Sequence, residues 1–164
     1  LILKSKKLSI FPAQEIHNRC IWEWRNEYKT RLMSLNSEFI PWETHKEWFI
    51  KSLKNSKSHI YVGIFENQPV SMVRYELSRN FKNAYEISIL VKSKFQGLGI
   101  GQELLNESLE IFFKRVSIKN RIIACVKNFT RICRLCKWAS AYCHVDVVTR
   151  PRQTINIETI RLYV

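Results

Sequence analysis

The sequence predicts an α+β fold with a mixed, mostly antiparallel sheet flanked by helices, and three observations support this fold class. Runs rich in β-branched and aromatic residues follow one another with only short turns between them at 59–65, 70–77 and 85–91, which is typical of antiparallel neighbours. Apolar residues then recur at spacings of three, four and seven over residues 100–113, as on one face of a helix. A strand-like run at 121–126 follows, and a strand–helix–strand connection indicates mixed strand direction.

The size and composition indicate a folded protein. The chain has 164 residues, of which 46% are hydrophobic and 12% aromatic, so a single domain over residues 1–164 can bury a core. No apolar run approaches the length that spans a bilayer, and the first residues lack the order of a signal peptide, so we expect a cytoplasmic protein. Five cysteines, an odd number, indicate reduced thiols rather than a disulfide framework.

The charge balance favours anionic partners. Lys and Arg number 27 against 14 Asp and Glu, which gives a net charge of +13. Nucleotide-containing small molecules, RNA and DNA are all anionic. Charge alone therefore does not separate an enzyme from a nucleic-acid-binding protein.

A short strand and a helix are expected at the N-terminus. The strand covers residues 8–11, Pro12 opens the helix, and residues 28–39 form a mostly polar loop after it. The helix runs over residues 14–28. Its apolar stripe consists of Ile16, Cys20, Ile21 and Trp24.

Arg25 and Asn26 lie at the end of this helix. A planar guanidinium in that place can face a phosphate or a carboxylate. The alternative is that Arg25 pairs with Glu23 or Glu27 on a solvated face. The residues alone favour the second interpretation.

A second helix is expected from Pro41 to Leu53, because Pro suits a first helical turn and aromatic residues follow at spacings of three and four. Trp48 and Phe49 are assigned to packing, as aromatic residues on one helical face usually are. For His45 a structural role and a place in a ligand cleft both stay open.

Three glycines in five residues join the strand at 85–91 to the helix that follows it. Gly97, Gly99 and Gly101 permit positive φ and let a ligand approach the main chain. The amides of this turn, with the positive end of the helix dipole behind them, suit a pyrophosphate. A P-loop is excluded because no Lys-Ser/Thr pair follows the last glycine, and the spacing is not that of dinucleotide-binding folds.

The pattern Gln96-x-x-Gly99-x-Gly101, between a strand ending at Val91 and an amphipathic helix, resembles the acetyl-CoA signature of the GNAT N-acetyltransferases. Further motifs occur in the same order in a subgroup that acetylates amino sugars on nucleotide carriers, including the 4-amino-4,6-dideoxy sugar N-acetyltransferases of pseudaminic-acid-type pathways. These motifs are Trp24-Arg25-Asn26, Ile40-Pro41-Trp42-x-x-His45-x-x-Trp48-Phe49 and Glu86-Ile87-Ser88-Ile89. The resemblance covers residues 7–127.

The resemblance implies acetyl-CoA as co-substrate and direct transfer to a primary amine, that of a nucleotide-linked amino sugar, within a ternary complex. In the family the strand before the turn splays from its neighbour, so residues 87–91 would act through main-chain N–H groups. The residues expected to bind acetyl-CoA are Ile89, Leu90, Val91, Gln96, Gly97, Leu98, Gly99, Ile100, Gly101 and Asn128. Those expected to bind the acceptor are Arg25, Asn26 and His45.

Glu86 is the preferred catalytic base, because a carboxylate near the start of that strand can take the ammonium proton directly or through water. An ordinary strand glutamate paired with a nearby Lys or Arg is an equal alternative. Tyr85 is expected to point to the opposite face of the sheet. Tyr142 is the candidate for the general acid, as the tyrosine nearest the family's acid position.

The C-terminal part departs from the resemblance. Similar enzymes continue with an Asn, a helix carrying Tyr and a Gly-Phe that ends it. Here Asn128 occupies the expected position of that Asn, and Leu135 falls roughly where the Tyr is expected. No glycine follows Gly101. Between Glu110 and Asp146 the chain has eight basic residues and no acidic one.

Several alternatives stay open. Cys133-x-x-Cys136 with Cys143-His144 supplies zinc-type ligands, but buried free thiols are the preferred interpretation and no metal is predicted. The basic stretch with interleaved aromatic residues also suits a non-catalytic RNA- or DNA-binding protein on a degenerate fold of this family. Among enzymes, the rival acceptor is a protein N-terminal or small-molecule amine. A monomer or homodimer without membrane contact is expected.

Overall fold

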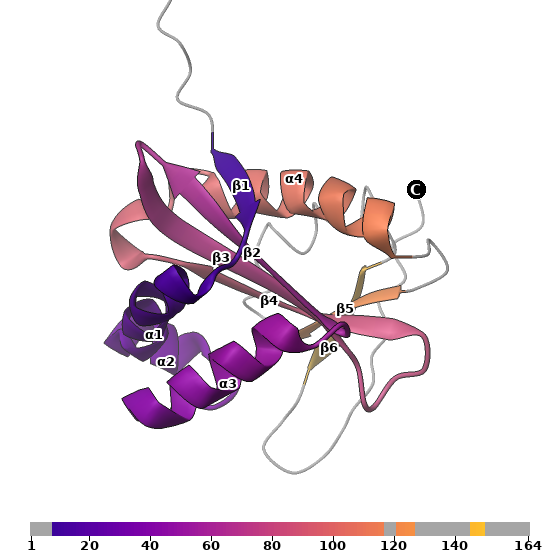
Figure 1. Ribbon diagram of the computed structural model, residues 1–164. Helices are drawn as coiled ribbons and strands as arrows, with labels where there is room; N and C mark the ends of the chain where they lie inside the picture. The colour runs from indigo at the N-terminus through magenta and orange to yellow at the C-terminus, as the bar shows by residue number, and fades with distance from the viewer. Residues whose placement is uncertain (1–7, 117–120, 127–144, 150–164) are drawn as a thin grey trace, which may run out of the picture.

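The computed structural model describes residues 8–116, 121–126 and 145–149. Its helices and strands confirm the predicted α+β class (Figure 1). In chain order they are β1 (Ser9–Pro12), η1 (Glu15–His17), α1 (Asn18–Asn26), α2 (Tyr28–Met33), α3 (Trp42–Lys54), β2 (Ser58–Phe65), β3 (Gln68–Leu77), β4 (Ala84–Val91), η2 (Ser93–Phe95), α4 (Ile100–Arg115), β5 (Arg121–Val126) and β6 (Val145–Thr149).

The six described strands form one sheet in chain order. Strands β1 to β4 are antiparallel neighbours, whereas β5 runs parallel to β4 and β6 parallel to β5. The predicted mixed direction is therefore confirmed, and β6 is an additional strand that was not predicted. The turn between β2 and β3 has positive φ at Glu66 (51°) and Asn67 (61°), as tight hairpins with twisted strands require.

Helices cover both faces of this sheet. The helix α4 lies along one face, and α1, α2 and α3 lie on the other (Figure 1). Because side chains alternate along a strand, β4 contributes to both layers. Tyr85, Ile87 and Ile89 belong to the apolar cluster against α4, whereas Leu90 belongs to the cluster that contains Trp24 of α1 and Phe49 of α3.

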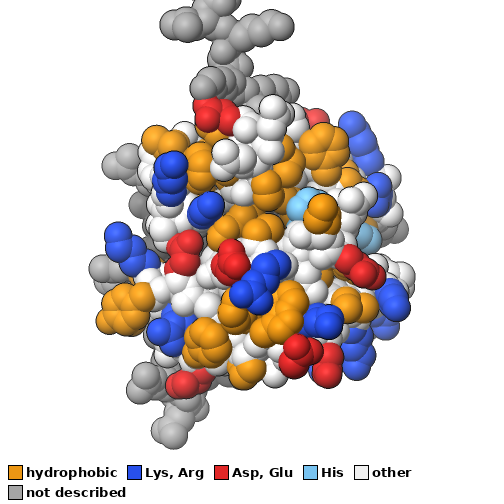
Figure 2. All heavy atoms as spheres, turned by 60° about the vertical axis from the view of Figure 1, so that its left-hand side comes forward, with side chains coloured by type: hydrophobic (Ala, Val, Ile, Leu, Met, Phe, Trp, Pro, Cys, Tyr) orange, Lys and Arg blue, Asp and Glu red, His pale blue; other side chains and the backbone are white. Residues whose placement is uncertain are grey.

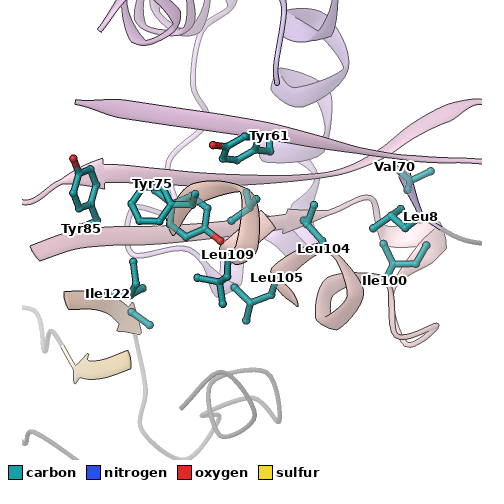
Figure 3. Close-up of a cluster of buried hydrophobic side chains, with 13 residues drawn as sticks. Leu8, Tyr61, Val70, Tyr75, Tyr85, Ile100, Leu104, Leu105, Leu109 and Ile122 are labelled. Atoms are coloured by element: carbon teal, nitrogen blue, oxygen red, sulfur yellow. The ribbon is translucent and has the colours of Figure 1, made fainter. Parts of the chain in front are cut away.

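The apolar stripe predicted for α4 packs on the sheet, as Figure 3 shows for Leu104, Leu105 and Leu109. Phe112 is fully buried and stacks on Tyr75 with ring centroids 4.4 Å apart. The Tyr75 hydroxyl lies 2.7 Å from the Ser108 hydroxyl, so the polar tip of the tyrosine is hydrogen-bonded inside the core. This side of the molecule is a well-packed support for the residues around β4.

The N-terminal predictions need three corrections. Pro12 ends β1, where it is in register with Tyr61, instead of opening a helix. Ile16 lies in the 3₁₀ turn η1 and is 81% exposed, so it does not belong to the apolar stripe of α1. Residues 28–33, predicted as loop, form α2, because the extended ψ of Glu27 (136°) ends α1 and the chain then starts a new helix.

Among the helices of the described residues, none has both the length and the apolar character needed to cross a membrane.

Candidate functional site

The glycine turn between β4 and α4 has the geometry that the sequence predicts. Gly97 and Gly99 adopt positive φ of 82° and 81°, which residues with a Cβ rarely do. A Cβ added to either glycine would meet no atom within 4 Å, so the surface of the turn is open to a ligand. Gly99 is the N-cap of α4, and the dipole of this helix therefore points its positive end at the same place.

The main chain of this turn presents N–H groups. The amides of Gln102 and Glu103 donate to the carbonyl of Gly99 at 3.0 and 3.1 Å. The amides of Ile100 and Gly101, at the first two helical positions, have no carbonyl within the helix to bind. Residues 87–102 include two lysines and no acidic residue, so the turn suits an anion such as a pyrophosphate.

The side chain of Gln96 has a supporting contact. Its Nε2 donates a hydrogen bond of 2.9 Å to the carbonyl of Val91, which ties the turn to the end of β4. Leu98 is 66% exposed at the tip of the turn, whereas the side chain of Ile100 is buried under it. An anion at this turn would thus contact main-chain groups more than side chains.

The strands β4 and β5 separate beside the turn. Their parallel pairing runs from Ala84 opposite Arg121 to Ile87 opposite Ala124 and ends there. Beyond that point β5 stays paired with β6, while β4 stays paired with β3 up to Val91. The β5-facing N–H and C=O groups of residues 88–91 therefore have no strand partner within the described part of the chain. Because the Lys92 amide binds the Val70 carbonyl of β3 and main-chain groups alternate sides along a strand, the β5-facing groups are those of Ile89 and Val91. The main-chain groups of Leu90, also predicted to bind the coenzyme, face β3 instead.

A polar cluster lies on the face of β3 and β4 that is turned toward α3. Arg74 is in register with Ser88, and Glu76 is in register with Glu86. The Arg74 guanidinium lies 3.3 Å from a carboxylate oxygen of Glu76 and 5.0 Å from the centroid of Trp48 in α3. The hydroxyl of Ser78 donates a hydrogen bond of 2.7 Å to Glu86 Oε1. As predicted, Tyr85 points to the other face, where it is buried against Phe112.

Arg25 and Asn26 lie where α1 meets the segment before α3. Arg25 Nη2 donates to the carbonyl of Asn36 at 2.7 Å, and its Nη1 is buried without a hydrogen-bond partner. Burial lowers the pKa of Arg25, and the nearby charge of Arg31 lowers it further. The alternative that Arg25 pairs with Glu23 or Glu27 is wrong, because Glu23 pairs with Arg19 and Glu27 binds Ser93.

The carboxamide of Asn26 holds the loop that leads to α3. Its Nδ2 donates to the carbonyl of Ile40 at 3.0 Å, and its Oδ1 accepts from the amide of Ile40 at 2.8 Å. Trp22 Nε1 donates to the same carbonyl at 2.7 Å. Asn26 thus fixes the position of this loop beside Arg25.

His45 lies inside the layer of helices. It is 3% exposed, and its ring lies 5.2 Å from Trp48 and 6.0 Å from Phe49, measured between centroids. Burial lowers its pKa to about 4, against the opposing effect of a hydrogen bond to the backbone of Asn18, so the imidazole is neutral at pH 7. Of the two roles left open for His45, this position favours packing.

A long-range hydrogen bond connects the junction of α1 and α2 to the segment before the glycine turn. The Glu27 carboxylate, between α1 and α2, accepts from the amide of Ser93 at 3.2 Å and also from the Ser93 hydroxyl. Ser93 begins η2, directly before the glycine turn. Neither this contact nor the ion pair between Arg74 and Glu76 was predicted from the sequence, because both depend on the strand register and on helix packing.

Several predicted residues lie outside the described part of the chain. They are Asn128, Tyr142, Leu135, Cys133, Cys136, Cys143 and His144.

Residues with exposed apolar side chains gather on α2 and the segment after it. Figure 2 brings the α1 and α2 side of the molecule forward and shows hydrophobic side chains at the surface among basic and acidic ones. The large hydrophobic residues exposed in this segment are Tyr28, Leu32, Met33, Leu35 and Phe39. This surface borders the segment that Arg25 and Asn26 hold in place.

Comparison with family models matches residues 18–138 to the model described as the acetyltransferase (GNAT) family. No similar sequence was found among curated proteins.

Several solved structures share the fold. The ribosomal-protein-alanine N-acetyltransferase from Brucella melitensis is 24% identical over 65% of this chain and 68% of its own, with a TM-score of 0.56. The spermidine N-acetyltransferase from Vibrio cholerae, in complex with CoA and spermine, is 16% identical over 66% of this chain, with a TM-score of 0.58. The match spans 64% of the length of the spermidine enzyme, slightly less than two thirds.

Proposed function

Because the chain belongs to the GNAT acetyltransferase family, whose members use acetyl-CoA as co-substrate, we propose that it acetylates the primary amine of a nucleotide-linked amino sugar. The observation that carries the acetyl transfer is the separation of β4 from β5 directly beside a glycine turn. The separation supplies free main-chain groups for a thioester and its pantetheine arm. The turn supplies main-chain N–H groups for the pyrophosphate of the same molecule.

The residues of the glycine turn fit this co-substrate because no side chain occupies the space over Gly97 and Gly99. No atom lies within 4 Å of a Cβ built on Gly97 or Gly99, so phosphate oxygens can approach the backbone. The buried side chains of Leu90 and Ile100 anchor the segment from both layers. In our proposal, residues 89–91 and 96–101 bind acetyl-CoA, chiefly through main-chain groups, with Asn128 as a further contact.

Glu86 acts as the base in the proposed reaction. It accepts the proton of the acceptor ammonium, directly or through water, so that the amine nitrogen can attack the thioester carbon. The C–N bond forms as the C–S bond breaks, and CoA leaves as the thiol after taking up a proton. N–H groups of β4 beyond Ile87 stabilise the negative charge on the carbonyl oxygen. Tyr142 is the candidate donor of the proton to sulfur.

Two arginines support an anionic acceptor. Arg25 and Arg31 each have a buried guanidinium nitrogen without a hydrogen-bond partner. Neither forms an ion pair with a carboxylate of the described residues. Two neighbouring cations are stabilised by a dianionic group such as a diphosphate, and they disfavour a polyamine such as spermidine. Asn26 contributes by holding the loop beside Arg25, and His45 by packing against Trp48 and Phe49 of α3.

An assay of thiol release from acetyl-CoA with a panel of amines tests the proposal. We expect turnover with a nucleotide-linked 4-amino-4,6-dideoxy sugar, and much slower turnover with spermidine or with a peptide bearing N-terminal alanine. Fast turnover of the peptide would mean that the acceptor is a protein N-terminal amine and not the sugar. Absence of acetyl-CoA binding in calorimetry, together with a salt-dependent gel shift of RNA, would favour the non-catalytic alternative.

The same proposal leads to an expected cellular location and oligomeric state. We infer that the protein works in the cytoplasm, where acetyl-CoA and nucleotide sugars are available together, and that it acts as a monomer or homodimer.

A further inference from the structure

Exposed apolar side chains concentrate in the segment that lies beside Arg25 and Arg31. Of the eight large hydrophobic residues that are exposed in the described part of the chain, five lie between Tyr28 and Phe39. Single exposed hydrophobic residues are ordinary on a protein surface, whereas a group of them among polar residues marks an interaction site. The polar groups next to this segment indicate the chemistry of what binds there.

Two of these polar groups are guanidinium groups that favour a diphosphate. Arg25 Nη1 and Arg31 Nε are buried and have no hydrogen-bond partner. Burial lowers the pKa of Arg25, and the charge of Arg31 lowers it further, so the two cations lie near each other. A diphosphate can bind both of them. In a nucleotide-linked sugar only one ribose separates the diphosphate from the base, so the base lies in the neighbourhood of the same arginines.

Phe39 is 54% exposed in this neighbourhood, although the backbone next to it is fixed. The amide of Ile40 donates to Asn26 Oδ1 at 2.8 Å. The carbonyl of Ile40 accepts from Asn26 Nδ2 at 3.0 Å and from Trp22 Nε1 at 2.7 Å. Three hydrogen bonds to α1 therefore hold the residue that follows Phe39.

The ring of Phe39 is also supported. Its centroid lies 5.9 Å from the ring of Trp22, with an angle of 82° between the planes, and Trp22 in turn contacts Trp42 at 5.6 Å. Arg25 Nη2 donates to the carbonyl of Asn36 at 2.7 Å, so Arg25 and Phe39 are attached to one short loop. An aromatic ring that is exposed but already held in place can bind a flat group with little loss of conformational entropy.

We propose that Phe39 is the surface on which the base of the nucleotide-linked acceptor stacks, while Arg25 and Arg31 bind its diphosphate. The inference rests on the proposed function, since only a nucleotide-linked acceptor carries a base. A base stacked on an aromatic side chain contributes about tenfold or more in affinity, with little preference among bases. Phe39 is therefore a specificity residue that selects a nucleotide carrier and does not contact the reacting atoms.

Calorimetry of the full chain in the presence of CoA, with UDP and inorganic pyrophosphate as probes, tests the inference. Phe39→Leu keeps an apolar side chain but removes the ring, so it should bind UDP about tenfold more weakly and pyrophosphate with unchanged affinity. Phe39→Trp retains an aromatic ring and should bind UDP at least as tightly as wild type. Phe11→Leu is the matched control, since Phe11 is a similarly exposed phenylalanine (52%) in β1, and both affinities should stay unchanged.

Two calorimetric results would overturn the inference. Unchanged UDP affinity in Phe39→Leu would place the base elsewhere, and an equal loss for UDP and pyrophosphate would show that Phe39 only supports the loop. Sedimentation velocity tests the alternative occupant of this surface, a second copy of the chain. A wild-type dimer that becomes a monomer in Phe39→Leu would identify a subunit interface and would also overturn the inference.

Kinetics separate this inference from the proposed function. Phe39→Leu should raise KM for a nucleotide-linked amino sugar about tenfold at unchanged kcat, and leave KM unchanged for the amino sugar 1-phosphate, which has no base. If the wild type acetylates the nucleotide-linked sugar and Phe39→Leu has the same KM, the proposed function stands and only the role of Phe39 is overturned. If the wild type acetylates only amines without a nucleotide, the proposed acceptor fails first, and the inference fails with it.

Discussion

The proposed coenzyme side and the proposed acceptor side of β4 are built from different parts of the chain. On the coenzyme side the groups come from one segment, residues 87–101, and they are main-chain N–H and C=O groups held in place by positive φ at two glycines. On the acceptor side they are side chains from β3, β4, α1 and α3, such as Arg74, Glu86 and Arg25.

This difference determines how each side can be disturbed. A main-chain group stays in place when a side chain is shortened, so the coenzyme side is sensitive to added atoms. A side-chain site loses its function when the side chain is shortened, so the acceptor side is sensitive to removed atoms. Substitutions of both kinds therefore test whether the two sides are built as described.

The largest effect is expected for Glu86→Gln on the acceptor side. The amide cannot accept the ammonium proton, so we expect kcat to fall roughly a thousandfold, within the range for loss of a general base. The affinity for acetyl-CoA should stay unchanged, because Glu86 points away from the α4 layer. Steady-state kinetics and calorimetry measure the two quantities. A kcat within threefold of wild type would remove Glu86 from the mechanism.

The next effect concerns stability on the acceptor side and its dependence on pH. His45 is buried with a pKa of about 4, whereas in the unfolded chain it binds a proton below about pH 6.5. As the pH falls from 6.5 to 4, protonation of the unfolded state alone lowers the free energy of unfolding by about 3 kcal/mol.

The variant His45→Phe keeps the ring contacts and removes this titration. Its free energy of unfolding should fall less steeply between pH 6.5 and 4 than that of wild type, whatever its value at pH 7.5. Urea unfolding at several pH values measures both slopes. Equal slopes would mean that His45 is protonated in the folded protein, and would return it to the list of acceptor-binding residues.

On the coenzyme side, Gly99→Trp should weaken acetyl-CoA binding roughly a hundredfold, or about 2.7 kcal/mol. The added indole occupies the open space over the turn, where the pyrophosphate is expected. The left-handed backbone at φ 81° also costs a side chain about 1 to 2 kcal/mol. Asn83→Trp is the matched control for strain, since Asn83 has a φ of 53° in the turn before β4. Equal affinities of the two variants would contradict the assigned turn.

The prediction for Arg25→Met returns to the acceptor side. Loss of a charged hydrogen-bonding group should raise KM for a nucleotide-linked amino sugar about twentyfold. KM for an amine without phosphate should not change. Arg19→Met, on the same helix but paired with Glu23 at the surface, is the control. A uniform rise of KM for all amines would show that Arg25 supports the loop at Asn36 and does not recognise an anion.

The same difference between the two sides explains how much could be predicted from the sequence. Gly97, Gly99 and Gly101 are local signals for a local structure, and the strand, turn and helix around them form as expected. The fold class followed from periodicity, since α4 and the antiparallel strands have clear patterns. Glu86 is the candidate base because it lies in the same short segment, and this role stays a prediction.

The acceptor side was harder to predict because it depends on register and packing. Arg74 faces Glu76, Ser88 and Trp48 only once β3 and β4 are aligned and α3 lies over them. Asn26 looked like a ligand contact, but its carboxamide binds the backbone of Ile40, which is distant in the sequence. His45 gave no local signal to separate a buried ring from an exposed one. Ile16 was misplaced because a 3₁₀ turn interrupts the helical spacing.

The smallest effect is expected for Ser93→Ala, which weakens the contact between the two sides. Glu27 loses the hydroxyl donor but keeps the amide of Ser93, so the free energy of unfolding should fall by about 1 kcal/mol. Because Ser93 precedes the glycine turn, the Kd for acetyl-CoA should also rise about two- to threefold. Ser34→Ala removes a hydroxyl that donates to the nearby carbonyl of Thr30, and should lower stability without changing that Kd. If the two variants bind acetyl-CoA equally well, the Glu27 contact stabilises the fold but does not connect the acceptor helices to the coenzyme turn.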